Sequence, residues 1–259
     1  MSTDHPAPSA PGAPRALVTG ASSGIGRATA QHLARAGYRV VATARRADRL
    51  ATLADEISCD TFVADLTVQA DVDALADHVI AGGPLTSLVN NAGGAVGADR
   101  VEDGDPADWA RMYDLNVLTT LRVTRALLPH LRADGGGDVL VVTSTAATGT
   151  YPGGAGYTGA KHAARMIVDT LRLELMGEPI RVLDIQPGLV ATPEFSVNRY
   201  RGDVEAAAKV YEGVAEPLTA DDVADVITFA LTRPHHVNLD SIVIRPRAQA
   251  THTLLHREP

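Results

Sequence analysis

The sequence predicts an α/β protein with a doubly wound parallel sheet and helices on both faces. Seven short apolar runs alternate with longer stretches of helical periodicity. The runs are continuously apolar, which is typical of strands buried on both faces of a parallel sheet. Regular alternation of strand and helix gives right-handed crossover units and therefore a doubly wound sheet.

The predicted strands are taken in chain order, and helical patterns fill the intervals between them. The strands occupy residues 16–20, 38–44, 61–66, 87–93, 138–144, 181–188 and 241–246. The longest interruption, residues 192–217, follows the sixth strand, and we expect a lid or substrate loop with a helix or two of its own. No internal repeat or linker divides residues 15–259, so they are predicted to form a single domain.

The start of the chain differs from the rest in composition. Residues 1–14 are rich in Pro, Ala and Ser, and are predicted to form a disordered tail. This tail lacks the apolar core of a signal peptide. No apolar run in the chain reaches the ~18 residues that a membrane span needs.

Charge and cysteine content exclude several classes of protein. A formal charge of −8 argues against a nucleic-acid or anionic-membrane surface, which needs clustered positive charge. The single Cys59 excludes an intrachain disulfide and fits a reducing cytoplasm. We therefore expect a cytoplasmic protein that binds anionic ligands through local features.

The first strand ends in TGASSGIG, which places Gly20, Gly24 and Gly26 at a strand-to-helix turn. Glycine permits positive φ and close approach of the backbone to a ligand, and the following helix offers free N–H groups to a pyrophosphate. A glycine triplet alone is a weak signal, and its spacing departs from G-x-G-x-x-G. Its place on the first strand-to-helix turn favours a dinucleotide.

The second strand ends in VVATARR, so Ala44 stands where NAD-binding domains usually carry an acid for the adenosine ribose. Arg45 and Arg46 follow, and a guanidinium can grip a 2′-phosphate that a carboxylate would repel. The alternative is a solvated arginine pair that opens a helix. We favour NADP(H) as the cofactor.

Six motifs occur in one order along the chain: TGASSGIG (19–26), NNAG (90–93), Asn116, Ser144, YTGAK (157–161) and QPGLVAT (186–192). Together they resemble the short-chain dehydrogenase/reductase family over residues 15 to about 247. The closing HHVNLDSIVIRP is similar to the branch with NADP-dependent 3-hydroxy acid dehydrogenases and clavulanate-type aldehyde reductases. The resemblance implies a Rossmann-type domain with about seven strands. It also implies a homo-oligomer, either a dimer or a homotetramer paired through two long helices.

The resemblance also implies a set of cofactor-binding residues, which share positions beside the cleft at the strand ends. Two of them leave a plainer alternative open, because Asp65 could cap the next helix and Pro187 could belong to an ordinary turn. The implied set, with the two arginines, is Gly20, Ser22, Ser23, Gly24, Ile25, Gly26, Arg45, Arg46, Asp65, Leu66, Asn91, Gly93, Tyr157, Lys161, Pro187, Gly188, Val190 and Thr192.

Tyr157 and Lys161 form the chemical centre of the prediction. Residues four apart on a helix share a face, with Cβ atoms about 5–6 Å apart. A free phenol has a pKa near 10, too high for ready proton exchange at neutral pH. An ammonium group in a water-poor cleft favours the phenolate, and lysine supplies it as a compact point charge.

Two further residues complete the predicted catalytic set. Ser144 follows the fifth strand, where ligands bind in parallel sheets, and its hydroxyl could stabilise a carbonyl oxygen that becomes an alkoxide. Thr143 and Thr145 are its rivals, and the spacing to Tyr157 favours Ser144. The resemblance gives Asn116 a place in a water-linked proton path to Lys161; the alternative is an ordinary polar helix residue.

These residues predict reversible, NADP(H)-dependent reduction of a small organic carbonyl, including a 3-oxo acid, with Tyr157 as proton donor. The alternatives are an epimerase or dehydratase on the same fold, or a non-catalytic NADP-binding regulator. No metal is expected, because the nine histidines lack ligand spacing and are assigned to the surface or core. Tyr151, Phe195 and Tyr200 either line the substrate pocket or are exposed loop aromatics.

Overall fold

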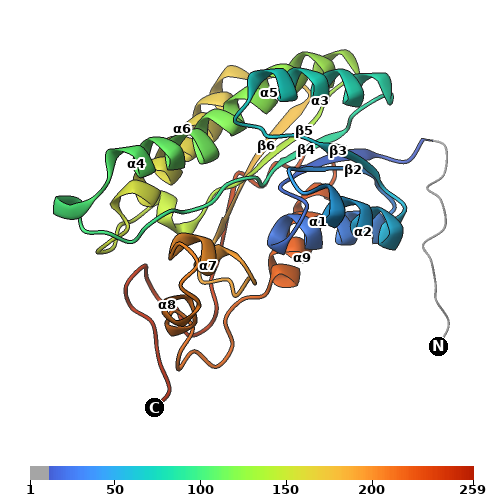
Figure 1. Cartoon of the computed structure of the whole chain (residues 1–259). Helices are drawn as coiled ribbons and strands as arrows, with labels where there is room; N and C mark the ends of the chain where they lie inside the picture. Colours follow the sequence, from blue (N-terminus) through green and yellow to red (C-terminus); the bar gives the residue numbers. More distant parts are fainter. Residues whose placement is uncertain (1–11) are drawn as a thin grey trace, which may run out of the picture.

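A computed structural model describes residues 12–259 of the chain (Figure 1). Its centre is a seven-stranded sheet of parallel strands in the order β3-β2-β1-β4-β5-β6-β7. This confirms the predicted fold class. Residues 1–11 of the predicted tail lie outside the described residues. The strands are β1 (Arg15–Thr19), β2 (Arg39–Ala44), β3 (Asp60–Val63), β4 (Ser87–Asn90), β5 (Gly137–Val142), β6 (Ile180–Pro187) and β7 (Ser241–Ile244).

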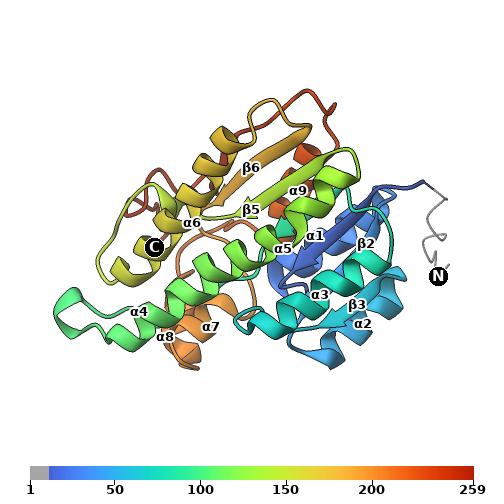
Figure 2. The ribbon, with the colours of Figure 1, turned by 90° about the horizontal axis from the view of Figure 1, so that it is seen from above.

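Helices cover both faces of the sheet, and Figures 1 and 2 show the two layers. One layer holds α1 (Gly24–Arg35), α2 (Ala47–Ile57) and α9 (Ala220–Leu231). The other holds α3 (Gln69–Ala81), α5 (Thr119–Ala133) and α6 (Ala155–Glu174), with α4 (Pro106–Tyr113) beside α6. No helix within residues 12–259 is long and apolar enough to cross a membrane.

The two largest apolar clusters lie one on each side of the sheet, because successive strand residues point to opposite faces, and a smaller third cluster surrounds Tyr157. On β6, Leu183 and Ile185 pack in the cluster that includes α1 and α9, whereas Val182 packs in the cluster of α5 and α6. On β5, Leu140 and Val142 belong to the first cluster. Alternate residues along these strands therefore face different helix layers.

The strand order reverses between β1 and β4, and this is where open α/β sheets bind ligands. The β1–α1 turn and the segment after β4 meet at this point. Observed strand β4 ends at Asn90, three residues earlier than predicted. The chain leaves the sheet there because Asn91 bonds sideways to β1, its Nδ2 donating to the Thr19 carbonyl over 2.9 Å.

Residues 192–217 hold two short helices, α7 (Phe195–Arg199) and α8 (Val204–Lys209), on the side of the sheet where the strands end. Figure 1 shows both near the C-terminal segment. The C-terminal residues bind this region directly, since the Glu258 amide donates to the Gly213 carbonyl over 2.7 Å. This arrangement makes the lid and the end of the chain one wall beside the strand ends.

Candidate active site

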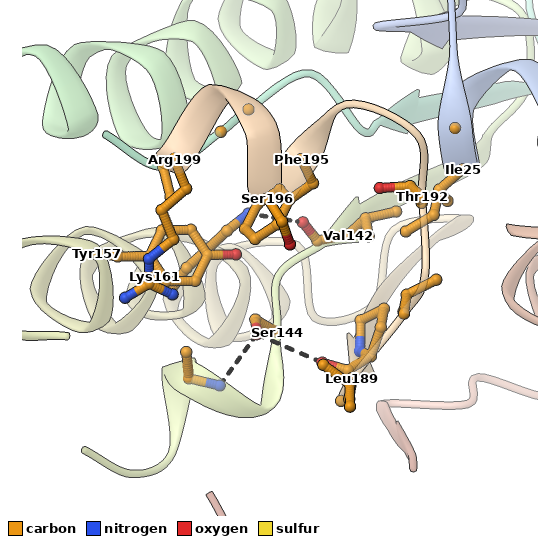
Figure 3. A pocket seen from close by; sticks show the side chains of 18 of the residues that line it. Ile25, Val142, Ser144, Tyr157, Lys161, Leu189, Thr192, Phe195, Ser196 and Arg199 are labelled. Atoms are coloured by element: carbon orange, nitrogen blue, oxygen red, sulfur yellow. Dashed lines mark hydrogen bonds between the residues drawn. The ribbon is translucent and has the colours of Figure 1, made fainter. Parts of the chain in front are cut away.

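A cavity of about 360 Å³ lies at the carboxyl ends of the strands. The β1–α1 turn, the segment after β4, the end of β5, the start of α6 and the loop after β6 all contribute to it. Helix α7 closes it from above, and Figure 3 shows Arg199 and Phe195 of that helix pointing toward Tyr157. The cavity therefore joins the predicted cofactor residues to the predicted catalytic residues.

The glycine turn has the shape that a dinucleotide needs. Gly20 has φ +67° and Gly24 has φ +52°, values that L side chains rarely adopt. A Cβ on Gly26 would lie 2.4 Å from the Gly20 carbonyl oxygen and 2.4 Å from Asn91 Nδ2. The first turn of α1 therefore packs against the strand ends with its backbone exposed to the cavity, where Ile25 also lies.

Of the two predicted 2′-phosphate ligands, Arg46 is the one that faces the glycine turn. Its Nη2 donates to Ser22 Oγ and to Ser23 Oγ, both over 2.9 Å. Its Nη1 pairs with Glu194 Oε1 over 2.8 Å, so the lid reaches across to the same guanidinium. Arg45 is exposed, and its charge lowers the pKa of Asp65. Arg46 and the two serine hydroxyls therefore lie together at this end of the glycine turn, where Ser23 Oγ also donates to Glu194 Oε2 over 2.9 Å.

The two predicted adenine contacts, Asp65 and Leu66, lie at the turn between β3 and α3. The Asp65 carboxylate accepts bonds from the Thr67 amide over 3.0 Å and the Thr67 hydroxyl over 2.8 Å. Burial raises the Asp65 pKa, but the two Thr67 bonds and the Arg45 charge leave it below its usual range. Leu66 is buried in the core, and neither residue lines the cavity. The Asp65 side chain therefore bonds within the turn before α3, whose N-cap is Val68, and its adenine contact stays a prediction.

The nicotinamide end of the predicted set lines the cavity through Pro187, Gly188, Val190 and Thr192. The Leu189 amide between them donates to Gln249 Oε1 over 2.8 Å, which ties this loop to the C-terminal segment. Thr192 Cγ2 lies 3.4 Å from where a Cβ on Gly24 would stand. The loop after β6 therefore lies against the glycine turn, on the opposite side of the cleft.

Tyr157 and Lys161 project together from the first turns of α6, and both are buried. Lys161 Nζ lies 5.8 Å from the centroid of the Tyr157 ring and donates to the Val142 carbonyl over 3.1 Å. Burial and then Tyr151 raise the Tyr157 pKa, while the Ser144 hydroxyl and the Arg199 charge lower it. The cation that lowers this pKa here is Arg199, whereas the sequence hypothesis assigned that effect to Lys161.

Ser144 is the hydroxyl of its segment that faces Tyr157 (Figure 3). Its Oγ accepts from the Ala146 amide over 3.0 Å and donates to the Pro187 carbonyl over 3.3 Å. The rival Thr143 directs its hydroxyl to Asp184 instead. Thr145 also lines the cavity, and its carbonyl oxygen lies 2.5 Å from His252 Nε2.

Asn116 sits in a π-helical turn, Asp114–Leu118, inserted between α4 and α5. Such a bulge widens the helix and is frequent at functional sites. Asn116 Nδ2 donates to the Gly94 carbonyl over 2.8 Å, and Oδ1 accepts from the Gly94 amide over 3.2 Å. A Cβ on Gly93 would lie 2.6 Å from Asn116 Oδ1 and 3.5 Å from Lys161 Nζ. Gly93 therefore lets both side chains approach the same stretch of backbone.

Several lining residues were not identified from the sequence. Arg199, Glu194 and Gln249 were not singled out, and His252, assigned to the surface or core, lines the cavity. Of the three candidate aromatics, Tyr151 and Phe195 line it, and the Phe195 ring centroid lies 5.7 Å from that of Tyr157. The C-terminal residues reach the site only through tertiary contacts, so no local pattern marks them.

The chain belongs to the short-chain dehydrogenase family, because the model of that family matches residues 14–200. An uncharacterized oxidoreductase of Mycobacterium tuberculosis is 56% identical over 236 residues, covering 91% of this chain and 92% of that protein. The NADP-dependent 3-hydroxy acid dehydrogenase of Salmonella typhi is 36% identical, covering 90% and 95%. These matches confirm the predicted family and branch.

A solved structure supports the same placement. The closed form of serine dehydrogenase complexed with NADP+ superposes with a TM-score of 0.86 at 34% identity, covering 94% of this chain and all of the other. The chain is therefore similar to oxidoreductases of this family along nearly its whole length.

Proposed function

We propose that the protein is an NADP(H)-dependent oxidoreductase that interconverts a small organic carbonyl compound and its alcohol. The observation that carries this is the meeting of the Tyr157 and Ser144 hydroxyls in one cavity with the glycine turn. The NADP-dependent dehydrogenases among its relatives support the cofactor. Arg46, with the Ser22 and Ser23 hydroxyls, offers the donors that a 2′-phosphate requires.

Each residue of the catalytic set has a distinct task in this proposal. Bound NADPH supplies the hydride that reduces the carbonyl carbon. Tyr157 donates its hydroxyl proton to the carbonyl oxygen, and Ser144 donates a hydrogen bond to that oxygen as its charge grows. Lys161 and Asn116 hold the path by which the proton on Tyr157 is replaced. The low exposure of Tyr157 and Lys161 strengthens these interactions by excluding water.

Arg199 extends the proposal to the substrate, which we infer to carry a carboxylate. Its Nη1 donates to the Tyr151 hydroxyl over 3.0 Å and its Nη2 to the Gly153 carbonyl over 3.3 Å. Its Nε is buried without a hydrogen-bond partner, and no carboxylate within residues 12–259 lies within 4.0 Å of the guanidinium. A guanidinium with free donors beside the reacting atoms suits a 3-oxo or 3-hydroxy acid.

The test is the change in NADPH absorbance with matched substrates at neutral pH. A 3-oxo acid and its methyl ester differ only in the carboxylate that Arg199 would bind. We expect turnover of both compounds, with a lower KM for the acid. NADPH binding without turnover of any aldehyde, ketone or 3-oxo acid would instead indicate the regulator, and so contradict the proposal.

We further propose that the protein acts in the cytoplasm as a homo-oligomer, either a dimer or a tetramer. The outer faces of α5 and α6 carry exposed apolar side chains, among them Leu121, Met166 and Leu173. Exposed apolar side chains gathered on two neighbouring helices are expected at a protein interface. Light scattering coupled to size-exclusion chromatography measures the mass in solution, and a mass of 27.1 kDa would contradict the oligomer.

A further inference from the structure

Asp184 is a fully buried carboxylate that the proposed reaction does not yet use. It lies on β6 between Leu183 and Ile185, which pack toward α1 and α9. Because strand residues alternate, Asp184 faces the opposite layer with Val182, the layer that contains α6. It therefore lies beneath the helix that carries Tyr157 and Lys161.

Hydrogen bonds hold this carboxylate, but no ion pair does. The Thr143 hydroxyl donates to Oδ1, Gln186 Nε2 donates to Oδ2 over 2.6 Å, and Ser241 Oγ lies 3.4 Å from Oδ2. Among residues 12–259, no arginine or lysine nitrogen lies within 4.0 Å of it. An ionised carboxylate away from water and without a salt bridge is costly. Its presence therefore calls for a reason other than stability.

The bond to Thr143 connects Asp184 to the catalytic segment. Thr143 is flanked by Val142, whose carbonyl accepts from Lys161 Nζ, and by Ser144, whose hydroxyl lowers the pKa of Tyr157. The Thr143 amide also donates to the Ile185 carbonyl over 2.9 Å. The end of β5 is thus fastened to β6 by one backbone bond to Ile185 and one side-chain bond to Asp184.

The same carboxylate is the charged neighbour that acts on Lys161. Burial lowers the pKa of Lys161 to about 8, and the negative charge of Asp184 opposes this effect. Burial in turn raises the pKa of Asp184, while the Thr143 and Gln186 bonds lower it. Each group thus lies within the field of the other across the α6–sheet interface.

We propose that Asp184 is a positioning residue for the reductase reaction, fixing the strand end that carries Val142 and Ser144 and keeping Lys161 as an ammonium ion. This inference rests on the proposed function, because the proposed reaction requires Lys161 to be charged during turnover. The role is indirect, since Asp184 acts through Thr143 and through its field rather than by touching the substrate.

Other charged groups near this interface do not replace Asp184. From α6, Arg165 lowers and Asp169 raises the pKa of Asp184, and these two residues pair with each other over 3.3 Å. From α7, Arg199 acts on Tyr157. From β7 comes only the Ser241 hydroxyl. Removing the Asp184 charge therefore leaves burial unopposed at Lys161, whose proton is then lost at lower pH.

Asp184→Asn removes the charge while keeping the shape. Gln186 Oε1 is buried without a partner among the described residues, so its amide can turn to accept from the new Asn amide. The chain has only two lysines, Lys161 and Lys209, so ¹³C-lysine labelling gives two side-chain signals to follow by NMR across pH. Lys209, exposed in the lid, is the internal control.

We expect the titration midpoint of Lys161 to fall by about one pH unit in Asp184→Asn, and that of Lys209 to stay unchanged. The upper pH limit of kcat should fall by the same amount. Asp240→Asn, which alters an exposed carboxylate at the start of β7, should move neither value. An unchanged Lys161 midpoint would overturn the inference, whatever the enzyme reduces.

Stability separates this role from a structural one. Since the pKa of Asp184 is raised by folding, its ionised form weakens the fold at any pH above its unfolded value. Asp184→Asn should therefore unfold at the same temperature as the wild type or higher, while kcat at neutral pH falls. A lower Tm together with a proportional loss of kcat would favour a purely structural role and contradict the inference.

A second pair of variants tests the same idea if Asp184→Asn does not fold. Thr143→Val removes the hydroxyl that binds Asp184, whereas Thr143→Ser keeps it. We expect kcat to fall about tenfold further in the valine variant than in the serine variant, with KM for NADPH the same in both. Equal kcat values in the two variants would contradict the positioning role. The NMR midpoint needs no substrate, so it is independent of the proposed reaction.

Discussion

The polar groups between β5 and β6 differ at the two ends of these strands. At the amino end, Arg181 Nε donates to Asp138 Oδ1 over 2.6 Å, and the Ser87 hydroxyl donates to Asp138 Oδ2 over 2.9 Å. The other nitrogens of Arg181 donate to backbone carbonyls, including that of Leu231 over 2.9 Å. Every nitrogen of this buried guanidinium is used, so this end of the strands is a closed structural network.

At the carboxyl end, and in the lid beside it, the polar groups are only partly bonded. Arg199 Nε and Gln186 Oε1 have no partner among the described residues, and the charges of Lys161 and Asp184 are not joined in a salt bridge. Donors and acceptors without partners, as at the carboxyl end, are typical of a site that binds a ligand. A network in which every group is bonded, as at the amino end, stabilises the fold. Substitutions at the two ends should therefore separate activity from stability.

The largest effect is expected at the carboxyl end, from Tyr157→Phe. Loss of the proton donor should lower kcat by about 10³-fold, with Tm and NADPH binding nearly unchanged. Tyr113→Phe, on the exposed face of α4, is the matched control and should retain full activity. Stopped-flow NADPH oxidation measures both, and appreciable turnover by Tyr157→Phe would refute its role.

At the amino end, Arg181→Met should lower stability rather than catalysis. It leaves the buried Asp138 carboxylate without its cation, which costs about 3–5 kcal/mol of unfolding free energy. Arg247→Met, whose ion pair with Glu216 is exposed, should cost almost nothing. Denaturant titration tests both. A large fall in kcat of the folded Arg181→Met protein would show that the two ends are not separate.

Arg199→Ala tests whether the guanidinium of this lid residue binds the carboxylate of the substrate. Loss of a charge-assisted bond should raise KM for a 3-oxo acid by about 10–100-fold, while KM for its methyl ester changes little. Arg201→Ala is the control, because this exposed lid arginine already pairs with Asp99 and Asp108. Equal changes for acid and ester would mean that Arg199 shapes the pocket without binding a carboxylate.

The smallest effect is expected at the far end of the cleft, where Arg46 already shares its guanidinium with Glu194. Arg46→Ala should raise KM for NADPH about tenfold and leave KM for NADH nearly constant. Arg45→Ala should have the lesser effect, since Arg45 is exposed, whereas Arg46 bonds to the serines of the glycine turn. An unchanged preference for NADPH in both variants would disprove the 2′-phosphate assignment.

The predictable part of the site lies in motifs with short-range rules. The glycines of the first turn, Ser144 at a strand end, and the four-residue spacing of Tyr157 and Lys161 each follow from local geometry. Asp65 shows the limit of that approach. The resemblance implies an adenine contact, and only the tertiary structure shows that the carboxylate is bonded to Thr67.

The sequence by itself determined the seven alternating strands, the glycine turn and the Tyr157–Lys161 pair, because these depend on periodicity and on neighbours along the chain. Only the tertiary structure decided that Arg199 of the lid and His252 of the C-terminal segment line the same cavity as this pair, and that the charge of Asp184 on β6 acts on Lys161. Their positions depend on contacts between residues far apart in the chain. The physical reason is that burial and charge at Tyr157 and Lys161 arise from packing, which no local spacing encodes.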